Sequence, residues 1–219
     1  MLIHSWVVGP LATNCYLVAC NETGEALMID PGFFTQEAEK ILKILRRKFK
    51  LKKILNTHGH VDHISGNSVL KRHTEADILI HRDDALMLAD PERNLSNMLG
   101  LNVISPKADR LLEDSEIVKV GALELKVIHT PGHTKGSISL FCEKEKVVFT
   151  GDTLFAGSIG RTDLPGSSFR EIVHSLNEKL MNLPEETIVY PGHGEKTSIG
   201  REKRINPYVS SRWEDLSRI

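Results

Sequence analysis

Stretches in which apolar residues recur every three or four positions indicate where this chain forms helices. The clearest covers residues 35–49, where the apolar positions are Ala38, Ile41, Leu42, Leu45 and Phe49. The same kind of pattern predicts a short helix at 66–73 and a longer one at 168–181. Residues 82–115 are mixed, which predicts helix in the first part and irregular structure after Pro91.

Short apolar runs separated by turn residues, such as those at 21–24, predict β-strands. They occupy residues 13–18, 26–29, 53–56, 78–80, 117–120, 123–128, 138–141, 147–150 and 187–190. Both halves of the chain therefore combine strands with helices. Two mixed sheets packed face to face, with helices on the outer faces, would bury all the apolar faces.

We therefore predict an α/β (α+β) sandwich that forms one domain over residues 1–219. A doubly wound parallel sheet is the alternative fold. The runs between 117 and 150 follow one another at hairpin spacing, which favours antiparallel pairs and argues against that alternative.

The composition is that of an ordinary globular protein, because 40% of the 219 residues are apolar and 26% are charged. The net charge of −1 gives no electrostatic reason to expect a nucleic acid or a membrane as partner. We expect a cytoplasmic location, since no run approaches the roughly 20 apolar residues of a membrane span and no signal peptide is evident. Cys15, Cys20 and Cys142 form no C-x-x-C pair, which predicts reduced thiols in the core.

The segment 57–63, with the sequence THGHVDH, carries the strongest chemical signal in the chain. It follows a predicted strand, where residues two apart point to the same side, so His58 and His60 can reach one metal ion together. Asp62 and His63 come after the turn at Gly59 and can face a second ion nearby.

Three later groups share one form, in which a possible ligand follows a strand and stands next to a glycine. These ligands are His133, Asp152 and His193. The complete set offers nitrogen and oxygen atoms and no sulfur, which suits Zn(II), Fe(II) or Mn(II). Seven ligands exceed one tetrahedral ion but suit two ions that share a bridging carboxylate and hold a hydroxide between them. The other five histidines are expected to be ordinary surface or core residues: His4, His73, His81, His129 and His174.

On these motifs the chain resembles the metallo-β-lactamase superfamily. The matching stretches are THGHVDH, TPGHT, GDTLF and YPGH, in the expected order, with IDPG near the start. The resemblance implies a four-layer αβ/βα sandwich with a binuclear metal site at one edge of the two sheets. It implies one metal held by His58, His60 and His133, another held by Asp62, His63 and His193, and Asp152 as the bridge.

Further features of the family bear on the site. Aspartate at position 152, where β-lactamases of two subclasses have cysteine, is similar to the glyoxalase II branch. Asp30 matches an aspartate that supports the site from behind, although a turn-capping role before Pro31 is equally compatible with the sequence.

The stretches GDTLFAGSIGRTDLPG and TSIGREKRINPYV resemble the short glyoxalase II-like hydrolases. Because only residues 194–219 follow His193, we expect no C-terminal helical domain of the kind that helps glyoxalase II to bind glutathione. Asp163 and Glu195 stand where that enzyme has tyrosines, which leaves glutathione specificity open. Arg161 is a candidate contact for a substrate carboxylate, and a local ion pair with Asp163 is its alternative role.

The resulting prediction is a metal-dependent hydrolase that cleaves a thioester of the hydroxyacylglutathione type with a metal-bound hydroxide. Asp62 and Asp152 are its expected catalytic carboxylates, and two divalent metals, zinc before iron or manganese, are its expected cofactors. A small molecule is the expected partner. An iron-dependent persulfide dioxygenase, with one iron on His58, His133 and Asp152, is the main alternative. A lactonase or phosphodiesterase of the same fold is another.

Overall fold

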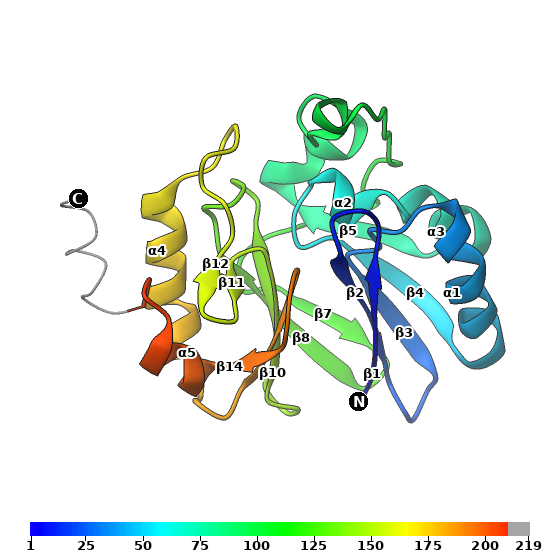
Figure 1. The fold of residues 1–219 in the computed structure, drawn as a ribbon. Coiled ribbons are helices and arrows are strands. Elements are labelled where there is room, and N and C mark those ends of the chain that lie inside the picture. Colours follow the sequence, from blue (N-terminus) through cyan, green and yellow to red (C-terminus); the bar gives the residue numbers. More distant parts are fainter. Residues whose placement is uncertain (210–219) are drawn as a thin grey trace.

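Two β-sheets packed face to face form the centre of the computed structural model, which describes residues 1–209 (Figure 1). Within these residues, the first sheet has the strand order β1-β2-β3-β4-β5-β6. Its strands are antiparallel from β1 to β3 and parallel from β3 to β6. Their bounds are β1 Leu2–Val8, β2 Thr13–Ala19, β3 Glu25–Ile29, β4 Lys50–Leu55, β5 Asp77–His81 and β6 Arg110–Leu112.

The second sheet has the order β14-β13-β10-β9-β8-β7 in the described part of the chain. Strands β7 to β10 are antiparallel, whereas β13 lies parallel to β10. The bounds are β7 Ile117–Val120, β8 Leu123–His129, β9 Ile138–Cys142, β10 Val147–Gly151, β13 Ile188–Pro191 and β14 Thr197–Ser198. A small hairpin of β11 (Leu154–Phe155) and β12 (Ser158–Ile159) follows β10.

Helices cover the outer faces of both sheets (Figure 1). Helices α1 (Thr35–Lys48) and α3 (Asn67–Thr74) lie on the first sheet, and α4 (Phe169–Glu178) and α5 (Ile199–Ile205) lie on the second. Shorter helical turns occur in the connections, at α2 Val61–Ile64, η1 Arg82–Ala89, η2 Ser96–Leu99 and η3 Leu180–Asn182. No helix in residues 1–209 is long and apolar enough to cross a membrane.

Strand β2 shows why this arrangement needs helices outside the sheets. All of its residues are buried, and successive side chains point to opposite faces. Cys15 and Leu17 pack in the cluster under α1, whereas Tyr16 and Val18 pack in the cluster between the sheets. A strand that is apolar on both faces must be covered on both, so the layers follow from the sequence of the central strands.

The two-sheet prediction is confirmed, with small differences at element ends. The helix predicted at 168–181 ends at Glu178 and continues as the 3-10 turn η3. Strand β6 was not predicted because Leu112 is its one buried residue. Helix α5 was not predicted because the buried Glu202 interrupts its apolar face. The three cysteines are buried and unpaired, as expected.

Tyr16 links the two sheets and provides a test of their packing. Its hydroxyl donates a hydrogen bond of 2.7 Å to the carbonyl oxygen of Pro191, and its ring packs against Phe149 and Tyr190. Tyr16→Phe keeps the ring but removes one of the two donors to this buried carbonyl, the other being Nδ2 of Asn14 at 3.0 Å, so we expect a loss of about 1 kcal/mol in the free energy of unfolding. Urea denaturation measures it. Tyr190→Phe is the matched control, and an equal loss in both variants would contradict this role.

Candidate metal centre

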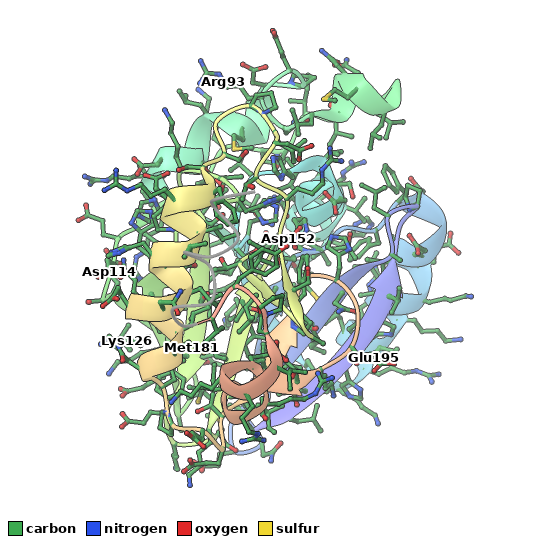
Figure 2. The ribbon with its side chains drawn as sticks, turned by 60° about the vertical axis from the view of Figure 1, so that its left-hand side comes forward. Arg93, Asp114, Lys126, Asp152, Met181 and Glu195 are labelled. Atoms are coloured by element: carbon green, nitrogen blue, oxygen red, sulfur yellow. The ribbon has the colours of Figure 1, made fainter. Side chains whose placement is uncertain are left out.

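The seven residues singled out in the sequence lie together where ends of both sheets meet. His58 follows β4, His133 follows β8, Asp152 follows β10 and His193 follows β13. Figure 2 shows Asp152 inside the molecule, whereas Arg93 and Glu195 lie toward its surface. These four residues therefore stand on short connections that follow buried strands.

His58, His60 and His133 form the first group, with one ring nitrogen of each within 4.8 Å of the others. The Nδ1 of His133 donates to the carbonyl oxygen of Arg161 over 2.8 Å, so its Nε2 carries the lone pair. That Nε2 lies 2.9 Å from Nδ1 of His60. The first sheet supplies two members and the second sheet supplies one.

Asp62, His63 and His193 form the second group, also within 4.8 Å. Asp62 Oδ2 lies 3.3 Å from Nε2 of His63 and 3.2 Å from Nε2 of His193. Helix α2 places Asp62 and His63 on successive positions of one turn. A hydrogen bond of 2.9 Å from Thr13 Oγ1 orients the Asp62 carboxylate.

Asp152 lies between the two groups. Its carboxylate oxygens are 3.5 Å from Nε2 of His63, His133 and His193. It therefore approaches members of both groups, which is the position that a bridging ligand requires. A Cβ at Gly192 would overlap Asp152 Oδ1, so glycine at 192 is what lets the strand end come this close.

Several buried atoms in this cluster have no hydrogen-bond partner, and they fit a metal site. They are Nε2 of His58, both ring nitrogens of His63 and Oδ1 of Asp152. An unpartnered buried polar atom costs about 1–3 kcal/mol, so a protein keeps such atoms for a purpose. Tetrahedral zinc with ligand bonds of ~2.0–2.2 Å separates its ligand atoms by roughly 3.3–3.5 Å. The separations of 3.2–3.5 Å around Asp62 and Asp152 match that spacing.

The protonation states also suit ligation. Burial and the neighbouring His133 lower the pKa of His60 to about 3, and burial with His63 lowers the pKa of His58. Both rings are therefore neutral at pH 7, as metal ligands must be. Burial opposes ionisation of Asp62, but the charge of His63 and the hydrogen bond from His193 outweigh it and lower the pKa of Asp62. These arrangements support ligation by the seven residues, which itself stays a prediction.

Asp30 supports the cluster from behind. Its carboxylate accepts hydrogen bonds of 2.7 Å from both N and Oγ1 of Thr57, and its Oδ2 lies 3.0 Å from His63 Nδ1. The contact with His63 favours the supporting role over simple turn capping, because a carboxylate on the far nitrogen orients a ligating ring. Asp30 adopts the left-handed region with φ 49°, which shows how closely the surrounding backbone fixes it.

Asp84 is a supporting residue that the sequence did not reveal. It lies in η1, 1% exposed, and its carboxylate accepts hydrogen bonds from Gly59 N, Thr134 Oγ1 and Gly136 N. Gly59 stands between His58 and His60 in the chain, whereas Thr134 and Gly136 follow His133. Asp84 therefore links the two loops that carry these histidines. No sequence signal marks Asp84, because it stands apart from every motif and next to another aspartate.

Arg161 contacts the site in two ways. Its carbonyl oxygen orients His133, as described above. Its guanidinium donates two hydrogen bonds of 2.9 Å to Asp163, so the local ion pair that the sequence offered as an alternative is present. Arg161 also lines the pocket that reaches the seven clustered residues. The side chain is 69% exposed, so its contact with a substrate stays a prediction.

The remaining histidines lie outside this cluster. The rings of His81 and His129 stack at 4.1 Å and 10°, and together with Asp83 they form another group that could hold a metal. Ring lone pairs lie in the ring planes, so parallel rings direct them side by side rather than toward one ion. Stacking is therefore the contact that this geometry favours. His4 packs on Trp6, His73 Nδ1 donates to the Val69 carbonyl oxygen, and His174 is exposed.

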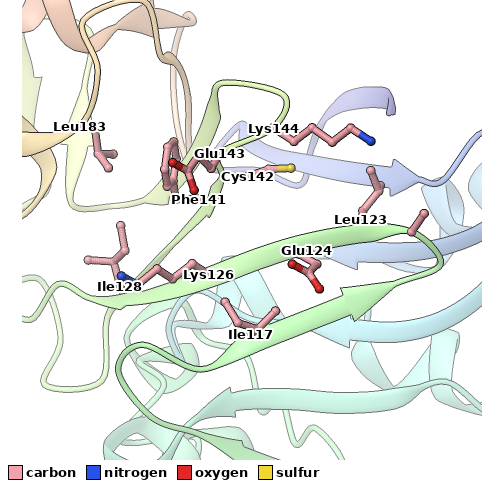
Figure 3. Close-up of a pocket in the computed structure, with 11 residues that line it drawn as sticks. Ile117, Leu123, Glu124, Lys126, Ile128, Phe141, Cys142, Glu143, Lys144 and Leu183 are labelled. Carbon is pink, nitrogen blue, oxygen red and sulfur yellow. The ribbon is translucent and has the colours of Figure 1, made fainter.

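A separate cavity of about 430 Å³ lies on the outer face of β7, β8 and β9 (Figure 3). Its walls combine apolar side chains such as Ile117 and Phe141 with Glu124 and Lys126. None of the seven clustered residues lines it. The pocket that reaches the cluster is therefore the candidate active site.

Comparisons with known proteins agree with this geometry. The family model described as "Metallo-beta-lactamase superfamily" matches residues 8–193. An uncharacterized protein of Aquifex aeolicus is 40% identical over 95% of this chain and 97% of its own. The hydroxyacylglutathione hydrolase GloC of Haemophilus influenzae is 37% identical over 91% of this chain and 93% of its own.

Solved structures give the same picture. BLEG-1 B3 metallo-beta-lactamase has a TM-score of 0.90 and 35% identity, covering 96% of this chain and all of that chain (100%). TTHA1623 in a di-iron-bound form has a TM-score of 0.82 and 34% identity, covering 94% and 99%. ETHE1 from Myxococcus xanthus has a TM-score of 0.80 and 31% identity, covering 99% and 89%.

The role of Asp84 can be tested by stability. Asp84→Ala removes the acceptor for three donors in the interior, so we expect a loss of roughly 3 kcal/mol or more in the free energy of unfolding of the metal-free protein. Chemical denaturation measures it. The neighbouring Asp83, whose side chain is 48% exposed, gives the control Asp83→Ala, expected within about 0.5 kcal/mol of wild type. Equal stabilities of the two variants would refute the role.

Proposed function

This chain belongs to the metallo-beta-lactamase superfamily, and from that premise we propose that it is a metallo-hydrolase that cleaves thioesters with a metal-bound hydroxide. The observation that carries the proposal is the position of Asp152, whose carboxylate lies 3.5 Å from members of both ligand groups. Asp152 could therefore serve as a ligand to both ions, and the ions would supply the activated water for hydrolysis. GloC, a hydroxyacylglutathione hydrolase by name, supports the thioester assignment.

The ligand set indicates how the metals would be held. His58, His60 and His133 would hold one ion, Asp62, His63 and His193 the other, and Asp152 would bridge them. We propose zinc, with iron or manganese as alternatives, because imidazole and carboxylate ligands suit all three metals. When bound, such ions lower the pKa of water toward 7 and stabilise the negative charge that develops on a carbonyl oxygen.

The protein's own groups prepare the attack. The carboxylates of Asp62 and Asp152 line the pocket floor, where either can accept a hydrogen bond from the attacking water and direct its lone pair at the substrate. Thr13 donates to Asp62 and so fixes the direction of that carboxylate. Because their pKa values are lowered, His58 and His60 are weak bases and do not take the proton that the water loses.

The pocket lining favours a thioester over substrates with poorer leaving groups. Besides the clustered residues, the polar side chains that line it are Arg161 and Asn94. Asn94 is committed to the carbonyl oxygens of Met87 and Val103, and Arg161 is always charged. The described lining thus offers no additional general acid. A thiolate leaves without one, because its conjugate thiol has a pKa of about 8.5.

Replacement of the bridging carboxylate is the direct test. Loss of a residue that merely orients a ligand costs about 10–100-fold in metal affinity or activity, so Asp152→Ala should cost more than about 100-fold in kcat/KM for thioester hydrolysis. Metal content after gel filtration should also fall. Asp77→Ala, at a side chain that is 64% exposed, is the control. A wild-type rate in Asp152→Ala would overturn the proposal.

Metal stoichiometry separates the proposed hydrolase from an iron-dependent dioxygenase. The dioxygenase needs one ion on His58, His133 and Asp152, and these side chains do lie in one cluster. We expect two ions per chain by elemental analysis, thioester hydrolysis that a chelator abolishes, and no oxygen uptake with glutathione persulfide. One iron per chain with oxygen consumption would instead assign the dioxygenase.

A further inference from the structure

The floor and the walls of the pocket above the seven clustered residues differ in chemistry. It has a volume of about 370 Å³, and the clustered histidines and aspartates form its floor. Its walls are mainly apolar and come from segments distant in the sequence. The apolar side chains are Leu11, Leu95, Met98, Leu99, Phe155 and Leu164.

Several of these wall residues are far more exposed than large apolar side chains usually are. Leu11 is 46%, Met98 70% and Leu99 45% exposed, and all three line this one pocket. Leu11 lies in the β1–β2 turn, whereas the other two lie in η2. Exposed apolar side chains that converge on one concave site mark a surface that contacts an apolar ligand.

The η2 wall is fixed in place rather than loosely attached. Leu95 begins it in the left-handed region with φ 64°, a strained conformation for leucine. Buried Asn94 holds the segment, because its Nδ2 donates to the carbonyl oxygens of Met87 and Val103 and its Oδ1 accepts from Ser96 N. The carbonyl oxygen of Asn94 also accepts from Val61 N in α2. A preformed wall needs no ordering when a ligand binds.

Positive charge is scarce in the same pocket. Arg161 supplies the one guanidinium or ammonium group of the described lining, and both of its hydrogen bonds go to Asp163. A glutathione arm carries two carboxylates, and the described lining offers them no unpaired cation. The lining instead offers apolar side chains to the arm of a substrate whose carbonyl lies over the metals.

From this contrast between a polar floor and apolar walls we propose that the site selects thioesters in which one side of the ester carries an apolar group, or arm. Leu11, Met98 and Leu99 would contact this arm, and a glutathione arm is not required. This specificity rests on the proposed thioester hydrolysis. The apolar arm can be on the acyl or the thiol side of the ester, since the walls offer the same contacts to both.

Binding of thioethers tests the specificity apart from catalysis, because they cannot be hydrolysed. Calorimetry on the purified, metal-loaded protein would compare S-alkyl-N-acetylcysteamines from methyl to octyl. Burial of one methylene is worth about 0.8 kcal/mol, so we expect Kd to fall about fourfold per methylene until the pocket is filled. S-hexylglutathione should bind no more than about threefold tighter than the hexyl cysteamine, an increment smaller than one further methylene gives.

Exposed positions give variants that should fold normally. In Met98→Gln and Leu99→Gln we expect octyl binding to weaken by at least about fivefold while methyl binding stays unchanged. Leu86→Gln is the matched control, since Leu86 is 67% exposed and lies outside the pocket lining. Hydrolysis is then measured for two series of thioesters, one with the alkyl group on the acyl side and one with it on the thiol side. The series in which kcat/KM rises with alkyl length shows which side of the ester lies against the apolar wall.

The outcomes separate this inference from the proposed function. Kd independent of chain length, or a preference above tenfold for the glutathione arm, would overturn the apolar specificity even if thioesters are hydrolysed. A Kd that falls with alkyl chain length in the wild type, but not in Met98→Gln and Leu99→Gln, would support it. Such binding without hydrolysis of any thioester would uphold the apolar pocket and overturn the proposed reaction.

Discussion

Buried polar atoms without hydrogen-bond partners are the constraint on which the rest of this structure depends. Nε2 of His58, Nε2 of His63 and Oδ1 of Asp152 lie in one small volume, and each costs free energy unless something binds it. Hydrogen bonds among the surrounding residues hold these atoms in place. Asp30 takes both donors of Thr57, Thr13 donates to Asp62, and Asp84 accepts from the two loops that carry the histidines.

Much of this could be predicted from the sequence, for reasons that particular residues make clear. The two-residue spacing of His58 and His60 just after a strand predicted that they act together, and the structure brings a ring nitrogen of each within 4.8 Å, although both lie in the connection between β4 and α2. The sandwich followed from strands such as β2, whose apolar residues belong to both faces. Family resemblance added the division into two ligand groups, and the structure brings each group together.

Other features could not be predicted because they depend on contacts distant in sequence. Asp84 meets Gly136 across 52 positions, and nothing near Asp84 distinguishes it from Asp83. Arg161 was expected to act through its side chain, but its carbonyl oxygen also orients His133. The apolar wall at η2 was missed because residues 95–99 have no strand or helix periodicity and are ordered by the side chain of Asn94.

Each ligand group draws on both sheets, and this has a thermodynamic consequence. His133 joins two residues that follow β4, and His193 joins two residues of α2. An ion bound to either group therefore acts as a crosslink between the two layers and favours their docking. A ligand at one hundred times its Kd adds about 2.7 kcal/mol to the stability of the folded state. With ions bound at the proposed groups, the folded population of this chain would therefore rise with the concentration of free metal around it.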